Sequence, residues 1–145
     1  HRRLCLKSIV YRGTPDYHGL VFGLDKGGSC QGMAFRIAPE NLDSELQKVW
    51  EREMFAETYI PTWVCVKTEN GDVSAITFVI NTKHEHYVPD LDLEKVAERV
   101  VRAEGKCGSC HDYVQNTVKF LHQLELRDPV LEQLLTLIEY PQISV

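Results

Sequence analysis

The chain of 145 residues has no apolar run approaching the roughly 20 residues that a membrane-spanning helix requires. It has no basic run interleaved with aromatic residues, and its formal net charge of -5 argues against a nucleic-acid partner. The apolar part of its first residues, which begin His1-Arg2-Arg3, is too short for a secretory signal. Its glycines do not follow the Gly-x-x-x-x-Gly-Lys spacing of a phosphate-binding loop. The sequence therefore predicts a protein with neither a membrane nor a nucleic-acid partner.

Disulfide bonds are not expected either. The chain has five cysteines, an odd number, and it is long enough to bury a core without cross-links. We therefore expect reduced thiols, a cytoplasmic location and a single domain over residues 1–145.

Strand patterns dominate the first half of the chain. Five segments rich in apolar or β-branched residues are expected to be strands, namely 3–11, 19–24, 30–37, 59–67 and 73–80. The turn residues at 25–28 predict that the second and third of these strands pair as a hairpin. Asn70-Gly71 predicts a second hairpin, formed by the last two strands.

Helical patterns appear once between the strands and then dominate the second half. The inserted helix is expected from Asn41 or Asp43, either of which can serve as its cap. A stripe of five apolar residues predicts a later helix that Gly105 ends, namely Leu93, Val96, Ala97, Val100 and Val101. Ser109 with Asp112, and Asp128 with Pro129, are start signals for two more helices. The predicted fold class is α+β, with a mostly antiparallel sheet curled towards a small barrel, one inserted helix and three C-terminal helices.

Glu53 is the first candidate functional residue. Four apolar residues share one face of the inserted helix, namely Leu42, Leu46, Val49 and Trp50. At about 100° per residue, Glu53 falls at the centre of their arc. Burial there would raise the pKa of its carboxyl group, as acid/base catalysis near neutral pH requires. Two structural alternatives stay open: the helix ends one turn early and exposes Glu53, or a buried arginine pairs with it.

Two further motifs suggest other chemistry. His84-Glu85-His86 resembles part of a metal site, but no other ligands are evident, so a solvated loop without metal is favoured. The segment 107–111 fits the Cys-x-x-Cys-His pattern of haem attachment and contains a Cys-x-x-Cys pair. No βαβ unit precedes that pair, and capping by Ser109 explains the same residues without chemistry.

Several segments together resemble a known family. Arg52-Glu53-Met54, followed by Tyr59-Ile60-Pro61-Thr62-Trp63, resembles the ChaC family of glutathione-specific γ-glutamylcyclotransferases, especially its bacterial members. Other segments resemble the family in the same order along the chain: Arg2-Arg3-Leu4 through Ser8, Arg12-Gly13, Gly28 to Arg36, and Gly105 to Tyr113. The resemblance covers nearly the whole chain.

The resemblance implies a chemistry. Members of this family cleave glutathione to 5-oxoproline and Cys-Gly, without a metal or an organic cofactor, as the substrate's α-amine attacks its own γ-carbonyl. The general acid/base glutamate of the family matches Glu53. Ser8, Arg12 and Tyr113 match segments near the pocket, where they would bind the substrate. Their structural alternatives are a strand hydroxyl, a turn charge and a packed aromatic ring.

One departure from the family affects these expectations. The family begins with a strand and a Tyr-Gly-Ser-Leu loop that holds the γ-glutamyl group, and this chain contains no such motif. The resemblance therefore predicts an N-terminally truncated chain with weak activity or none. A non-catalytic member or fragment of the same fold, and a thiol redox protein using Cys107 and Cys110, stay open as alternatives. The oligomeric state is not predicted.

Overall fold

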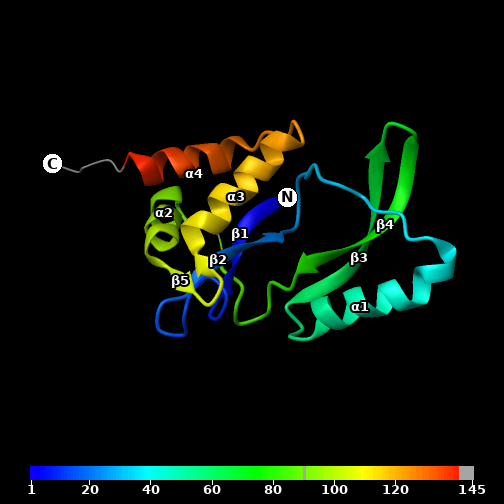
Figure 1. The fold of residues 1–145 in the computed structure, drawn as a ribbon, viewed down its shortest axis with the longest axis horizontal. Helices are drawn as coiled ribbons and strands as arrows, with labels where there is room; N and C mark the ends of the chain where they lie inside the picture. Colours follow the sequence, from blue (N-terminus) through cyan, green and yellow to red (C-terminus); the bar gives the residue numbers. More distant parts are fainter. Residues whose placement is uncertain (90, 141–145) are drawn as a thin grey trace. The chain divides into compact units, whose positions relative to one another are not determined.

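The computed structural model describes residues 1–89 and 91–140, which form two compact units. Unit 1 consists of His1–Arg3 and Gly23–Tyr87, and unit 2 of Leu4–Phe22 and the described residues from Val88 to Tyr140. The elements in chain order are β1 (Arg2–Ser8), β2 (Gly19–Leu24), a 3-10 turn (Pro39–Asn41), α1 (Leu42–Met54), β3 (Tyr59–Thr68), β4 (Gly71–Ile80), α2 (Leu93–Arg102), β5 (Glu104–Gly105), β6 (Gly108–Ser109), α3 (Cys110–Gln123) and α4 (Pro129–Glu139) (Figure 1).

β1 to β4 form a sheet in the order β1-β2-β4-β3. In unit 1, β3 and β4 pair antiparallel from Tyr59↔Ile80 to Thr68↔Gly71. β2 meets β4 in parallel at Leu24↔Val79. Gly71 has φ +110°, a conformation that glycine adopts without strain, and it accepts a hydrogen bond of 2.7 Å from the Thr68 hydroxyl. The hairpin predicted from Asn70-Gly71 is therefore confirmed.

The predicted strand 30–37 is wrong, and so is its hairpin with 19–24. Residues 29–38 have no regular structure, and Met33 and Phe35 are 58% and 80% exposed. The physical reason lies in the strand order. β2 already has β1 on one side and β4 on the other, so neither of its edges is left for a hairpin partner. The turn after β2 is held instead by the Asp25 carboxylate, which accepts hydrogen bonds from Arg3 Nε (3.0 Å) and the Tyr87 hydroxyl (3.1 Å).

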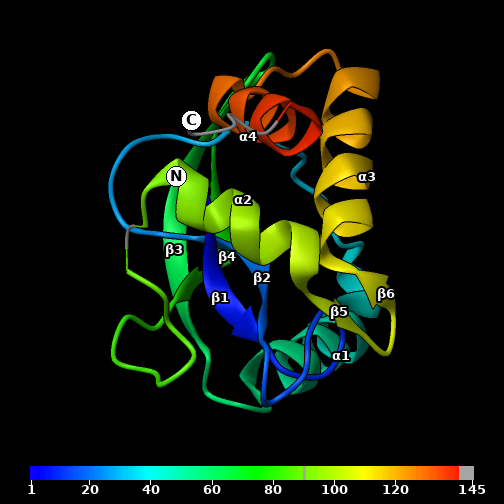
Figure 2. The same cartoon turned by 90° about the vertical axis from the view of Figure 1, so that its left-hand side faces the viewer.

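Unit 2 contains the main hydrophobic core. Buried apolar side chains of β1, β2, the three C-terminal helices and the segments that flank α2 form it: Leu4, Leu20, Val88, Val96, Ala97, Val100, Ala103, Cys110, Val114 and Leu134. Figure 2 shows these helices, α2, α3 and α4, packed against one another. Val101, which the sequence placed on the apolar stripe of α2, is 54% exposed, so its inclusion in that stripe was wrong.

Both predicted C-terminal helix starts are confirmed. Ser109 Oγ accepts from the Asp112 N–H at 3.0 Å and caps α3. Asp128 Oδ1 accepts from the Leu131 N–H at 3.3 Å and caps α4, with Pro129 at its first position. Such caps pair backbone N–H groups that no helical carbonyl can reach.

Unit 1 holds α1 and the β3–β4 hairpin. The rings of Trp50 on α1 and Phe78 on β4 meet edge to face, with 6.2 Å between centroids. No residue of α1 is fully buried. Among the described residues of unit 1, one apolar side chain is buried, that of Ile80. None of the helices in the described part of the chain combines the length and apolarity that a membrane span needs.

The predicted fold class is confirmed: α+β, with one helix inserted before β3 and three helices after β4. The single domain expected from the chain length stays a prediction.

Candidate functional site

Ser8 and Arg12 are joined where β1 ends. The Arg12 backbone N–H donates to Ser8 Oγ at 2.9 Å, and Ser8 is only 7% exposed. This bond closes the turn that leads away from the strand, so β1 ends at Ser8 and not at the predicted residue 11. Because the Ser8 oxygen accepts this bond, its own hydroxyl proton remains available to another acceptor.

The Arg12 guanidinium connects three parts of unit 2. Its Nη1 donates to the backbone carbonyl of Cys107 at 2.6 Å and to that of Ser109 at 3.3 Å. Its carbon atom Cζ lies 5.3 Å from the centroid of the Tyr113 ring, within the range of a cation–π contact. Arg12 therefore binds both the turn before α3 and the first turns of that helix.

Tyr113 is held from its other side by β2. Its hydroxyl oxygen accepts a hydrogen bond of 3.1 Å from the Phe22 N–H, and the two rings lie 5.3 Å apart. Burial raises the pKa of Tyr113, and the Phe22 N–H and the charge of Arg12 offset that effect only in part. The phenol therefore keeps its proton at neutral pH and can donate it to an acceptor.

The close approach of Arg12 to the segment before α3 depends on Gly105. A Cβ atom at residue 105 would lie 2.5 Å from the Gly13 nitrogen and 2.7 Å from the Arg12 nitrogen. The neighbouring backbone is also bonded to the turn after β1, since the Cys107 N–H donates to the Tyr11 carbonyl at 2.9 Å. β5 and β6, which the sequence did not predict, form the small hairpin that presents these groups.

The cysteine motif at 107–111 contributes to packing and capping. Cys110 is fully buried, and its thiol donates to the Leu20 carbonyl at 3.1 Å. Burial raises the pKa of the Cys110 thiol, whereas redox-active cysteines have a lowered pKa. Cys107 is exposed, and both cysteines are free thiols. The thiol redox interpretation therefore gains no support from the environment of Cys110.

Glu53 lies near the end of α1, in unit 1. Its side chain is 23% exposed, so the position at the centre of the apolar arc leaves Glu53 partly buried. The apolar stripe around it is itself only half covered, since Trp50 is 42% exposed. Glu53 Oε1 accepts from Arg52, whose Nε is 2.8 Å away and whose side chain is 73% exposed. An arginine does pair with Glu53, as one alternative expected, but this arginine is exposed and leaves Oε2 without a partner among the described residues.

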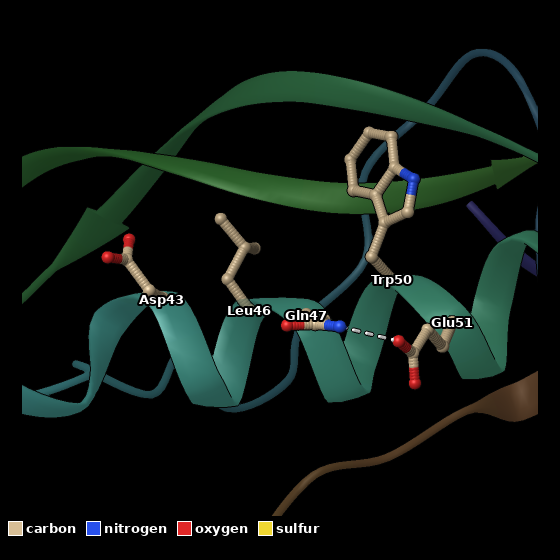
Figure 3. Close-up of a pocket in the computed structure, with 5 residues that line it drawn as sticks. All are labelled: Asp43, Leu46, Gln47, Trp50 and Glu51. Atoms are coloured by element: carbon tan, nitrogen blue, oxygen red, sulfur yellow. Dashed lines mark hydrogen bonds between the residues drawn. The ribbon is translucent and has the colours of Figure 1, made fainter.

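A shallow depression lies on another part of α1 (Figure 3). Five residues line it: Asp43, Leu46, Gln47, Trp50 and Glu51. Leu46 and Trp50 point towards the strands of the hairpin, and Gln47 donates to Glu51 at 2.8 Å. No predicted site residue lines this depression, so it is not the candidate site.

The structure brings Ser8, Arg12 and Tyr113 together in unit 2, whereas Glu53 belongs to unit 1. The groups missed from the sequence are backbone ones, the carbonyls of Cys107 and Ser109 and the amide of Phe22. Two glycines, Gly105 and Gly108, bracket the β5–β6 turn, and Gly108 has φ +97°. That spacing was the available sequence signal for the hairpin.

The described residues contain no group of three or more His, Cys, Asp or Glu side chains that could hold a metal ion. In the loop 83–87, His84 Nδ1 accepts from the His86 N–H at 3.1 Å, and the two rings lie 5.0 Å apart. One ring nitrogen of His84 is therefore already used within the loop.

Solved structures define the fold. A crystal structure of a γ-glutamylcyclotransferase specific to glutathione from yeast superposes with a TM-score of 0.73, covering 99% of this chain and 85% of that one at 15% identity. The chain therefore has the γ-glutamylcyclotransferase fold. The model of the ChaC-like protein family matches residues 1–140, and the chain belongs to this family.

Curated relatives agree with this assignment. The glutathione-specific γ-glutamylcyclotransferase of Escherichia coli (strain K12) is 33% identical over 136 residues, which are 93% of this chain and 59% of the relative. γ-Glutamylcyclotransferase 2-3 of Arabidopsis thaliana is 27% identical over 130 residues, 83% of this chain and 65% of the relative. The chain thus spans less than two thirds of the length of these relatives.

Proposed function

We propose that the chain acts as a γ-glutamylcyclotransferase, a lyase that cleaves glutathione to 5-oxoproline and Cys-Gly. The observation that carries this proposal is its similarity to the Escherichia coli glutathione-specific enzyme over most of the chain. Membership of the ChaC-like family supports the same activity. The proposed reaction requires no metal and no organic cofactor.

The proposed reaction is a cyclisation within the substrate. The free α-amine nitrogen of the γ-glutamyl group attacks its own γ-carbonyl carbon and forms a five-membered lactam. The amide bond to the cysteinyl nitrogen breaks, and its electron pair remains on that nitrogen. Because nucleophile and electrophile belong to one molecule, the main requirement is a site that folds the substrate so that the two atoms meet.

Glu53 is the proposed general acid/base. Its carboxylate takes a proton from the α-ammonium group, which frees the nucleophilic amine, and returns a proton to the departing nitrogen. The carboxylate is therefore unchanged over one turnover. The partial exposure of Glu53, and an oxygen Oε2 that Arg52 does not use, support this role.

Ser8, Arg12 and Tyr113 form the proposed substrate-binding group, in which the two hydroxyls donate to the substrate and Arg12 supplies a positive charge beside them. Ser8 and Tyr113 each accept one hydrogen bond from the backbone and retain a hydroxyl proton. Such donors suit the carboxylates of glutathione and the oxygen on which negative charge develops during the attack. The positive charge of Arg12 next to them favours an anionic ligand.

The test is product formation from glutathione. The purified chain is incubated with glutathione, and 5-oxoproline and Cys-Gly are quantified together. We expect the two products in equal amounts. We expect neither product from the Glu53→Gln variant. A folded chain that binds glutathione without releasing either product, also when the family's Tyr-Gly-Ser-Leu segment is joined to its N-terminus, would overturn the proposal and favour a non-catalytic member of the fold.

We also propose a cytoplasmic location. All five cysteines are free thiols in the structure, as is typical of proteins from reducing compartments. Native protein isolated with its thiols blocked during lysis is expected to yield five blocked cysteines and to fractionate with cytosolic markers. Disulfide-linked or membrane-associated material would contradict this location.

A further inference from the structure

The Arg12 guanidinium contacts backbone carbonyls and an aromatic ring of the protein itself. One nitrogen, Nη1, lies between the carbonyls of Cys107 and Ser109, at 2.6 Å and 3.3 Å. The guanidinium carbon Cζ also lies over the ring of Tyr113, 5.3 Å from its centroid. A planar guanidinium can make a forked contact and a ring contact together, whereas the ammonium group of lysine cannot reproduce both.

The two carbonyls belong to the segment that starts α3. Ser109 is the residue that caps this helix, through the bond from the Asp112 N–H to its side chain. Tyr113 follows Ser109 by four residues, about one helical turn, so the position of the cap determines the position of the ring. Arg12 therefore restrains Tyr113 twice, once through the helix start and once through the ring face.

The Tyr113 hydroxyl has one direction left for donation. Its oxygen accepts the Phe22 N–H from β2 at 3.1 Å, so its proton must point elsewhere. Burial keeps the phenol protonated by raising the pKa of Tyr113. The ring is thus held between Arg12 on its face and Phe22 at its tip, and the hydroxyl is an oriented donor.

We propose that Arg12 is a positioning residue that acts through Tyr113, by fixing the start of α3 and the tyrosine ring, and not by its own contact with the substrate. The inference rests on the proposed function, in which the Tyr113 hydroxyl binds the substrate. The inference assigns the hydrogen bond with the substrate to the Tyr113 hydroxyl and gives Arg12 an indirect role. A catalytic group that moves by about 1 Å can lose about 100-fold in rate, so this indirect role has a measurable effect.

A double-mutant cycle tests the assignment. Arg12→Lys, Tyr113→Phe and the double variant are compared with the unaltered chain in kcat and KM for glutathione. Arg12→Lys is expected to lower kcat/KM by up to about 100-fold although it keeps the positive charge. The double variant is expected to be no worse than Tyr113→Phe alone, because the residue through which Arg12 acts is already altered. Losses that multiply in the double variant, or near-complete retention of activity in Arg12→Lys, would overturn the positioning role.

Arg99 supplies a matched control. Its Cζ lies 4.6 Å from the Tyr17 ring centroid and its Nη1 is 3.5 Å from the His18 carbonyl, so it makes the same kinds of contact away from Tyr113. Arg99→Lys is expected to leave kcat unchanged. If Arg12→Lys does not fold, as judged by circular dichroism, Arg12→Gln takes its place, since an amide can donate to one of the two carbonyls.

The failure of the inference is distinguishable from the failure of the proposed function. A folded chain with Arg12 and Tyr113 unaltered that yields no 5-oxoproline, with or without the family's Tyr-Gly-Ser-Leu segment at its N-terminus, refutes the proposed function. An active chain in which the Arg12 and Tyr113 losses multiply refutes only the positioning role.

Discussion

Cys110 and Leu20 are joined by two hydrogen bonds in the core of unit 2. The thiol donates to the Leu20 carbonyl at 3.1 Å, and the Leu20 N–H donates to Sγ at 3.4 Å. A cysteine inside a motif that suggests haem or redox chemistry thus connects α3 to β2. Substitutions of Cys110 that keep both hydrogen bonds should therefore differ in stability from substitutions that remove them.

Cys110→Ala is expected to destabilise the fold by about 2 kcal/mol, because it removes the partner of both Leu20 groups in a buried site. Cys110→Ser retains a donor and an acceptor and is expected to lose less. Urea unfolding followed by circular dichroism measures both changes. Cyclotransferase activity is expected to remain nearly intact in Cys110→Ser, whereas a thiol redox function that uses Cys107 and Cys110 would be lost.

Glu53→Gln is expected to lower kcat by about 100- to 10,000-fold, the usual contribution of a general acid/base. The amide keeps the shape of the side chain but can neither take a proton from an ammonium group nor return it. Release of 5-oxoproline at saturating glutathione is the measurement.

Glu51→Gln is the control for this change, because Glu51 lies on the same helix and accepts a hydrogen bond of 2.8 Å from Gln47. Its kcat is expected to stay within twofold of the unaltered value. Equal losses of kcat from the two substitutions would show that removing any carboxylate from α1 impairs activity. That outcome would contradict the role of Glu53 as the general acid/base.

Gly105→Ala is expected to destabilise the fold by roughly 1–3 kcal/mol, as overpacking commonly does, because its Cβ would lie 2.5 Å from the Gly13 nitrogen. The backbone on both sides must shift to admit the methyl group. Gly32→Ala is the matched control, since a Cβ there meets nothing within 4 Å. Thermal unfolding of both variants should separate them, and equal midpoints would contradict the close approach at residue 105.

The α3–α4 connection contains an acid-sensitive ion pair. Hydrogen bonds from Arg127 and then His122 lower the pKa of Glu132 from 4.5 to about 2. Because the folded-state pKa lies below the unfolded one, the stabilisation is present above pH 4.5 and is lost as the pH falls towards 2.

Urea midpoints measured between pH 6 and pH 2 test this dependence. Glu132→Gln is expected to reduce the loss of stability in that window, and added salt is expected to weaken the effect because the pair is near the surface. Glu98→Gln, which removes a surface pair with Arg102, serves as the comparison. An unchanged pH profile in Glu132→Gln would contradict the assignment.

Local features were predictable because their contacts span only a few residues. The caps at Ser109 and Asp128 each involve a backbone N–H three residues later. The turn at Asn70-Gly71 likewise depends on its own backbone conformation. The position of Glu53 on the apolar side of α1 was also visible, but its degree of burial depends on how much of α1 the hairpin covers.

The sequence by itself determined the helices, the caps at Ser109 and Asp128 and the β3–β4 hairpin, because side chains and turn residues specify these within a few positions. Asn41 lies before α1 as expected, but its side chain makes no capping hydrogen bond. The sequence also determined the family, through motifs spread along the chain. The tertiary structure alone decided that β2 is a central strand, which denied 30–37 its expected partner. It alone joined Arg12 to Cys107, 95 residues away. The acceptor there is a backbone carbonyl, which every residue carries, so no side-chain pattern in the sequence marks it.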